Sequence, residues 1–346
     1  MTDYELKNCS FVRNALMIII VAYHSIIFLS GNWFNDAIDI GFKSLAIEYL
    51  CNWLNSFHVY AFTFMSGYIF YYIKYEKGGY QNYRLFLANK VKRLLIPYLF
   101  VSLFWAIPIH SLIYGFDFSQ IAYRFILGAA PNQLWFLLML FFVFAIFFPL
   151  SKVFKEKKAS VLLVILFAAI GIVLNHYFPN VLQIWSSLRF ITFFYLGFKT
   201  RQSWRFVLKK IPFLFFVVFD VVLFVGSCFL QTQTGSLSQL LNVFLLYVIN
   251  IVGSFMAWTS LQHIAKYFSN NKVNSFFAQR SMIVFLFHQQ VIYIVIGFLF
   301  NEVNIFLIAF FNFLFSLSFS LLISVVFLRF NWTRFLIGEK PKKNLT

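Results

Sequence analysis

Long runs of apolar residues alternate with short polar segments along the whole chain. Most runs are close to the roughly 20 residues that a helix needs to cross the hydrocarbon core of a bilayer, and 185–198 is shorter. The runs lie at 11–31, 50–73, 94–114, 134–150, 160–176, 185–198, 211–231, 238–262, 281–300 and 303–328. The pattern predicts an all-α, polytopic membrane protein with about ten transmembrane helices.

Basic residues gather in every second segment between the runs. The Lys- and Arg-rich segments are 74–93, 151–158, 199–210, 263–280 and the tail after 328. The intervening segment 115–133 has only Arg124, and 177–184 and 232–237 have no Lys or Arg. By the positive-inside rule, this alternation predicts an even number of helices with both termini in the cytoplasm.

Composition agrees with a membrane protein. Of the 346 residues, 61% are hydrophobic and only 11% are charged, against roughly 25% charged in soluble domains. The net charge of +17 is spread over short clusters, so we expect the bilayer, and not nucleic acid, to be the partner.

Cys9, Cys51 and Cys228 have no metal-ligand spacing, and we expect no metal site. We also expect no cleavable signal peptide and no attached soluble domain.

Arg13 and His24 are the most informative pair. They lie eleven residues apart in the first run, which is otherwise almost free of charge. On a helix this spacing is about 16 Å and about three full turns, so both side chains share one face. Ionisable groups inside a membrane segment are costly and usually functional. The pair predicts a cation at the cytoplasmic mouth of a polar tunnel and a base, His24, deeper inside.

Three further constellations combine polar and aromatic groups. His58 opens the second run, followed by Ser66 and Gly67, and is interpreted either as a substrate ligand or as an interfacial packing residue. Trp135 begins the fourth run and is either an aromatic-belt residue or a platform for a sugar. Lys90 and Arg93 are three residues apart before the third run, where they could grip phosphates or act as a topological anchor.

Other buried charges and histidines are weaker candidates. Arg189 lies inside the short run 185–198 and is expected to line a polar cavity. Asp220 is an acid well inside a run, and its carboxylate could pair with Arg189 or join two helices. His288, in the ninth run, could be a substrate ligand or a hydrogen-bonded packing group.

At these residues the chain resembles acyltransferase family 3, a family of integral membrane proteins. The motifs that carry the resemblance are Arg13-x10-His24, Phe57-His58 with Phe64-Met65-Ser66-Gly67, Lys90-x-x-Arg93 with Leu94-Leu95-Ile96-Pro97, Leu134-Trp135-Phe136-Leu137, Phe194-Tyr195-Leu196-Gly197 and Leu286-Phe287-His288. The chain departs from the family at Tyr60, where a proline is common, and at Lys90, where the family has arginine. The resemblance predicts a membrane domain over 9–330 and a short basic cytoplasmic tail over 331–346.

The resemblance implies transfer of an acyl group, usually acetyl from acetyl-CoA, to a hydroxyl of a carbohydrate or lipid-linked glycan. It implies catalytic roles for His24 and Arg13, and donor binding by Arg13, Lys90, Lys92 and Arg93. The implied acceptor-binding residues are His58, Trp135, Arg189, Tyr195 and His288. Because no esterase-like domain is expected, the transfer would be completed within the membrane domain. A bacterial cytoplasmic membrane is the expected location, and a homo-oligomer is possible.

Two other classes of function fit the same pattern. A flippase or polymerase of a glycan pathway is also basic, with scattered intramembrane charges. A third interpretation is an inactive relative that acts as a scaffold. The presence of Arg13 and His24 argues against it.

Overall fold

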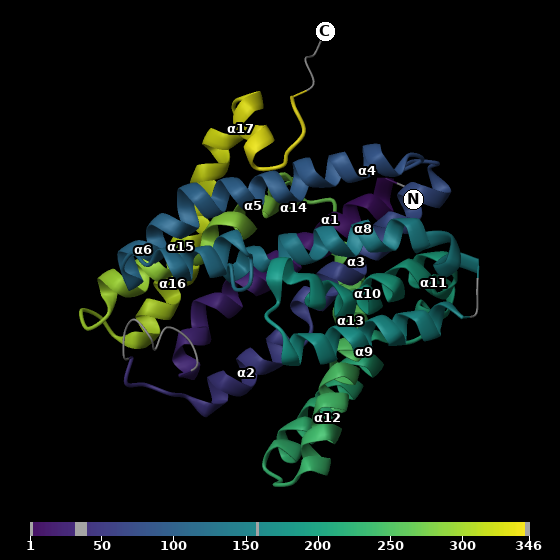
Figure 1. Cartoon of the computed structure of the whole chain (residues 1–346), viewed down its shortest axis with the longest axis horizontal. Coiled ribbons are helices and arrows are strands. Elements are labelled where there is room, and N and C mark those ends of the chain that lie inside the picture. Colours follow the sequence, from purple (N-terminus) through teal and green to yellow (C-terminus); the bar gives the residue numbers. More distant parts are fainter. Residues whose placement is uncertain (1–2, 32–39, 157–158, 343–346) are drawn as a thin grey trace. The chain divides into compact units, whose positions relative to one another are not determined.

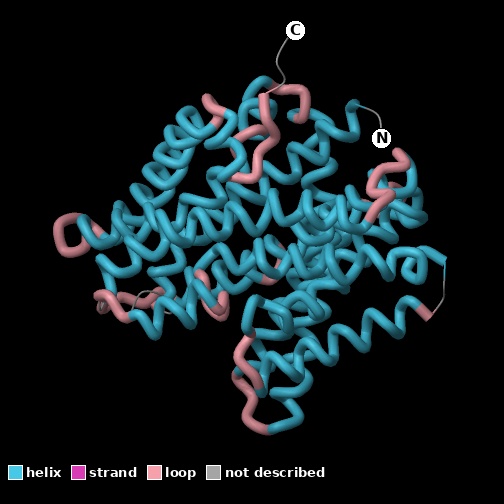
Figure 2. The backbone as a smooth tube through the Cα atoms, turned by 45° about the horizontal axis from the view of Figure 1, so that its top comes forward, coloured by secondary structure: helices cyan, strands magenta, loops and turns pink. Residues whose placement is uncertain are grey.

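The computed structural model describes residues 3–31, 40–156 and 159–342. These residues form helices joined by short turns, with no strand in the described part of the chain (Figure 2). Several charged residues of the segments between the runs lie outside the described residues: Asp36, Asp39, Lys157, Lys158 and Lys343. Among the described residues nine helices are long and apolar enough to cross a membrane. The prediction of an all-α polytopic membrane protein is therefore confirmed, while the side on which the termini lie stays a prediction.

The chain divides into two compact units. Unit 1 comprises residues 1–20, 49–79 and 193–278, and unit 2 comprises 21–48, 80–192 and 279–346. Helices α1 (Asp3–Ile26), α2 (Leu45–Asn55) and α10 (Ile184–Lys199) contribute residues to both. Each unit is described by itself below.

Unit 1 is built around a bundle of long helices with an aromatic core. Besides its parts of α1, α2 and α10, it contains α3 (His58–Tyr71), the π-helix η2 (Tyr72–Glu76), the π-helix η8 (Thr200–Trp204), α11 (Arg205–Leu208), α12 (Phe213–Gln231), α13 (Ser236–Phe268) and α14 (Lys272–Ala278). Helices α12 and α13 run side by side as a hairpin (Figure 1). The core cluster includes Leu16, Phe64, Tyr68 and Trp258.

Unit 2 holds the remaining elements. They are the 3-10 helices η1 (Ile27–Ser30), η6 (Asn132–Leu134) and η7 (Val181–Gln183), the π-helices η3 (Val91–Leu95), η4 (Ser102–Ala106) and η5 (Ala122–Ile126), and the α-helices α4 (Tyr83–Lys90), α5 (Ile96–Val101), α6 (Ile107–Tyr114), α7 (Phe118–Ile121), α8 (Trp135–Glu156), α9 (Ser160–Tyr177), α15 (Ser281–Leu299), α16 (Ile305–Phe327) and α17 (Asn331–Leu336). Helices α15 and α16 pack against each other.

The apolar run at 50–73 does not form one long helix, and this is where the observed helices differ from the expected ones. The run divides at Ser56 and Phe57, between α2 and α3. The His58 ring contacts the Leu54 carbonyl oxygen through Nδ1 at 2.6 Å, and Ser56 Oγ donates to the carbonyl of Trp53. Side chains therefore satisfy backbone groups that the break exposes. A hydropathy window does not detect such a break, because it averages over the whole run.

Two prolines explain the wide turns in the segment 83–114. Pro97 and Pro108 stand near the first positions of α5 and α6, directly after the π-helices η3 and η4. A proline lacks the N–H that would bond to the fourth residue before it, and its ring clashes with that carbonyl. A π-turn widens the backbone there and accommodates the ring. The segment therefore stays helical throughout while its faces rotate.

In unit 1, α3 and α10 approach so closely that only glycine fits at the crossing. A Cβ on Gly67 would overlap the carbonyl of Phe194, and a Cβ on Gly197 would overlap the carbonyl of Phe64. We expect Gly67→Ala to destabilise the protein by about 3 kcal/mol, because the two backbones must separate. Unfolding of the detergent-solubilised protein measures this effect.

The matched control is Gly297→Ala in α15, where the added Cβ would meet no described atom within 4 Å apart from its chain neighbours and the backbone of its own helix. This change should be neutral or should stabilise the helix by about 0.5–1 kcal/mol. Equal stability of the Gly67 and Gly297 variants would contradict the close crossing.

Candidate functional site

In unit 2 the rings of His24 and His288 are in direct contact. His24 is near the end of α1 and His288 is in the middle of α15. His288 Nε2 lies 3.1 Å from His24 Nδ1. The sequence predicted a role for each histidine separately but not their pairing, because 264 residues separate them.

The backbone around His288 determines which ring nitrogens carry protons. His288 Nδ1 lies 3.0 Å from the carbonyl oxygen of Val284 and 2.9 Å from that of Phe285. Carbonyl oxygens only accept, so Nδ1 of His288 is the donor and its Nε2 in the neutral ring is an acceptor. His24 must then donate from Nδ1 to His288, which leaves the lone pair of His24 on Nε2. This arrangement orients a basic nitrogen as a carboxylate does in hydrolase triads.

His24 lies on the wall of a polar cavity of about 370 Å³ within unit 2. The other walls come from the turns between α7 and α8, from η7 and from α15. They include Arg124, Asn132, Trp135, Gln183 and Gln289. Amide, indole, imidazole and guanidinium groups therefore share one cavity, a set of groups suited to a polar ligand rather than a lipid chain.

A buried amide network holds this wall in place. The side chain of Gln133 donates from Nε2 to Gln290 Oε1 at 2.8 Å and to the Leu286 carbonyl at 2.9 Å, while its backbone N–H donates to Gln289 Oε1 at 2.9 Å. Gln289 in turn donates to the hydroxyl of Tyr293 at 2.7 Å. The network joins η6 to α15, and its members satisfy one another where water is scarce. In the sequence, the signal of this network is the pair of adjacent glutamines, Gln289 and Gln290, inside an apolar run.

Of the predicted acceptor-binding residues, Trp135 lines the cavity beside His24. Arg189, also in unit 2, is not among the described residues that line this cavity. Its guanidinium lies 5.4 Å from the centroid of the Phe190 ring, which the Trp135 indole also contacts, edge-on at 5.6 Å. Tyr195 and His58 instead belong to unit 1 and are buried, Tyr195 with the Lys199 ammonium 5.7 Å from its ring. For His58 the structure favours the packing interpretation, since its ring caps the carbonyl of Leu54.

The three predicted phosphate-binding residues of unit 2 have different surroundings. Lys90 turns inward, with its Nζ 3.5 Å from the centroid of the Phe144 ring, an arrangement stabilised by cation–π attraction. Lys92 and Arg93 are exposed on η3, and neither has an ion pair among the described residues. The latter two are therefore available to an anionic ligand.

Arg13 belongs to unit 1, on the part of α1 that packs against α14. Its Nη2 donates to the carbonyl oxygen of Ala278, and the neighbouring Asn14 donates to Asn274 Oδ1 at 2.7 Å. This contact fixes the position of the guanidinium, which has five donors in all. Its predicted common tunnel with His24 stays a prediction, because the two side chains lie in different units.

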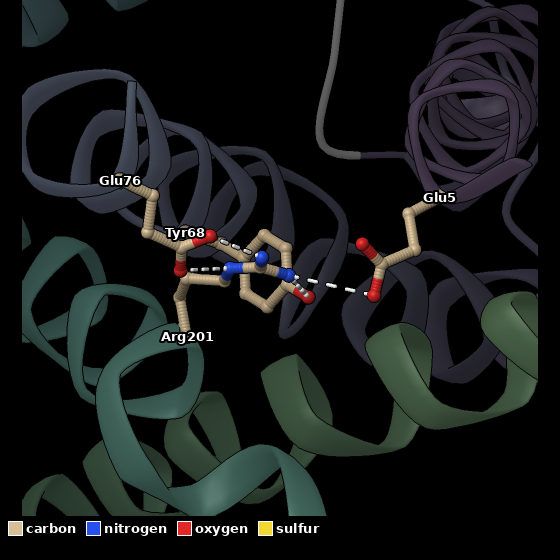
Figure 3. Close-up of polar contacts among 4 residues, drawn as sticks. All are labelled: Glu5, Tyr68, Glu76 and Arg201. Carbon is tan, nitrogen blue, oxygen red and sulfur yellow. Dashed lines mark hydrogen bonds and ion pairs between the residues drawn. The ribbon is translucent and has the colours of Figure 1, made fainter. Parts of the chain in front are cut away.

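A second polar cluster, which the sequence analysis treated only as loop charge, surrounds Arg201 in unit 1. The Arg201 side chain is 2% exposed and forms a bidentate ion pair with Glu76, with Nε 2.7 Å from Oε1 (Figure 3). Its Nη1 donates to the Tyr68 hydroxyl at 3.1 Å and lies 3.5 Å from Glu5. These bonds hold the pKa of the Glu76 carboxyl below its usual value. Because its partners are internal, the cluster is structural rather than a ligand site.

Asp220, the predicted partner of Arg189, bonds elsewhere. Its Oδ2 accepts a hydrogen bond of 2.8 Å from Trp53 Nε1, so the carboxyl joins α12 to α2 within unit 1. The structure therefore supports the interpretation of Asp220 as a helix-to-helix contact.

A family model described as an acyltransferase domain matches residues 10–329. The matched span includes His24, His288 and the other residues predicted to act in catalysis, donor binding or acceptor binding. No curated protein and no solved structure shows a significant match to the chain.

Proposed function

The chain belongs to acyltransferase family 3, and we propose that it transfers an acyl group, acetyl in the first instance, from acyl-CoA to a hydroxyl of a cell-surface glycan or its lipid-linked precursor. The observation that supports this proposal most is the contact between His24 and His288 on the wall of a polar cavity. The contact directs the basic nitrogen of His24 away from His288, as a general base requires.

In the proposed reaction His24 acts at the acceptor hydroxyl. Its Nε2 takes the proton as the hydroxyl oxygen bonds to the acyl carbon, and later gives it to the departing thiolate of CoA. His288 accepts from His24 Nδ1–H throughout and stabilises the imidazolium that forms. A variant of the same chemistry has His24 carry the acyl group transiently before the acceptor takes it.

The donor is proposed to bind through its phosphates. Acyl-CoA supplies the activated acyl group, and its charges call for cations at the cytoplasmic side. Lys92 and Arg93 fit this role because they are exposed and lack an ion pair among the described residues. Arg13 brings a guanidinium with five donors, one of which bonds to the carbonyl of Ala278. Lys90 is proposed to contribute its positive field, since rings enclose its ammonium group.

The acceptor is proposed to enter from the outer side of the membrane. With both termini in the cytoplasm, segments 115–133 and 177–184 face outward, and both contribute to the cavity wall. Trp135 provides an aromatic face on which a sugar ring can stack, and Arg189 supports it through Phe190.

Binding of radiolabelled acetyl-CoA to the purified full chain in detergent tests the proposal. We expect saturable binding that Arg13→Ala weakens about tenfold, because one charge-assisted contact contributes roughly 1.5–3 kcal/mol. Arg329→Ala, which removes an exposed arginine after α16, is the control and should bind normally.

A flippase or polymerase would not bind acetyl-CoA, so absence of binding contradicts the proposal. In cells, the glycan of a deletion strain should lose its acetyl groups, as measured by mass spectrometry. Unchanged acetylation would contradict the proposal independently.

A further inference from the structure

Arg124 brings a positive charge to the cavity that holds His24. It lies on η5 and is half-buried. Among the described residues that line the cavity, Arg124 alone carries a fixed charge, since the others are amides, alanines, His24, Trp135 and Tyr293. The wall therefore has a positive charge and no carboxylate to balance it.

Membrane topology does not account for this arginine. The segments predicted to face outward are poor in Lys and Arg, and Arg124 is the single one in 115–133. The positive-inside rule disfavours a cation there. An arginine on that side, in the wall of a cavity, therefore indicates a role other than setting the membrane topology.

Among the described residues, none provides an anion that pairs with Arg124. Its guanidinium has no hydrogen bond or ion pair with any of the described residues. The acid nearest to it in sequence, Asp117, accepts from the backbone N–H groups of Ser119 and Gln120, which holds the pKa of its carboxyl below the usual value. Asp117 is therefore engaged as the cap of α7.

The amides of the cavity are mostly engaged as well. Gln183 Nε2 donates to the carbonyls of Gly128 and Ala129, and Gln133 and Gln289 bond within their own network. By contrast, Nδ2 of Asn132 is buried without a hydrogen-bond partner among the described residues. Arg124, Asn132 and the indole N–H of Trp135 are thus donors on this wall without a hydrogen-bond partner among the described residues.

We infer that the acceptor carries an anionic oxygen group, a carboxylate or a phosphate, next to the hydroxyl that reacts, and that Arg124 binds this group. The inference rests on the proposed function of the His24 cavity. A guanidinium presents paired donors that match both groups bidentately. A neutral sugar would leave the guanidinium unbalanced in a cavity partly removed from water, and the cavity would therefore discriminate against it.

Isothermal titration of the purified full chain in detergent, with three probes, tests the inference. The probes are methyl β-D-glucuronide, glucose 1-phosphate and methyl β-D-glucoside, which differ in carrying a carboxylate, a phosphate or neither. We expect at least one anionic probe to bind about tenfold or more tightly than the glucoside, and the preferred probe identifies the group. Arg124→Gln should abolish the difference, Arg124→Lys should keep part of it, and Arg329→Gln should leave it intact.

Equal binding of the three sugars, including no binding of any of them, overturns the inference. So does an Arg124→Gln variant that keeps the preference and loses only turnover, because Arg124 would then stabilise the reacting oxygen instead. The titration requires neither acyl-CoA nor His24. A failure of the proposed acyl transfer would therefore appear in the acetyl-CoA and His24 experiments, and a failure at Arg124 in this one.

Discussion

His24→Ala is expected to lower the rate of acyl transfer by about 10²–10⁴-fold, the usual contribution of a positioned general base. The loss follows from the geometry of unit 2, where His288 orients His24 within the cavity. The measurement is incorporation of labelled acetyl into glycan by membranes that contain equal amounts of wild-type and variant protein.

The matched control is His176→Ala, which removes an exposed histidine near the end of α9. It should retain wild-type activity. His288→Gln retains an acceptor for His24 Nδ1–H and should keep more activity than His288→Leu, which has none. Full activity of His24→Ala at normal expression would remove this residue from the chemistry.

Glu76→Gln is expected to cost about 3 kcal/mol of folding stability, the low end for a broken buried ion pair, because Glu76 itself is one-third exposed. The substitution leaves the guanidinium of Arg201 buried without its bidentate partner. Unfolding of the purified protein in mixed micelles measures the loss. The control is Glu48→Gln, which breaks a pair whose cation, Lys43, is about half exposed, and it should cost less than about 1 kcal/mol.

The contribution of Glu76 should also depend on pH. The pKa of this carboxyl is lower in the folded protein than its ordinary value of 4.5. Its stabilising contribution is therefore fully present above 4.5 and is lost as the pH falls through the folded-state pKa. The stability difference between the wild type and Glu76→Gln should shrink over that acid range. A difference independent of pH, or equal losses for the Glu76 and Glu48 variants, would contradict the assigned pair.

The sequence indicates His24 as the candidate base, whereas only the structure shows that its partner is His288. A histidine inside an apolar run can be recognised from the sequence as a functional candidate, because an ionisable group is energetically costly inside a membrane. The contact with His288 joins positions 264 residues apart, and no local pattern predicts which two helices will meet. Arg201 illustrates the same limit: among the loop charges it looked like a topological signal, whereas the fold buries it against Glu76 and Tyr68.

By itself, the sequence determined that the protein is helical and crosses a membrane, because the transfer free energy of an apolar segment depends only on the residues within it. It also determined the family and most of the candidate residues, since these form short motifs. Tertiary structure alone decided that the second run breaks at Ser56 and Phe57, that Lys90 turns into an aromatic cluster, and that Arg124 and His24 share one cavity. These features depend on packing between distant segments, which hydropathy and spacing along a single segment do not describe.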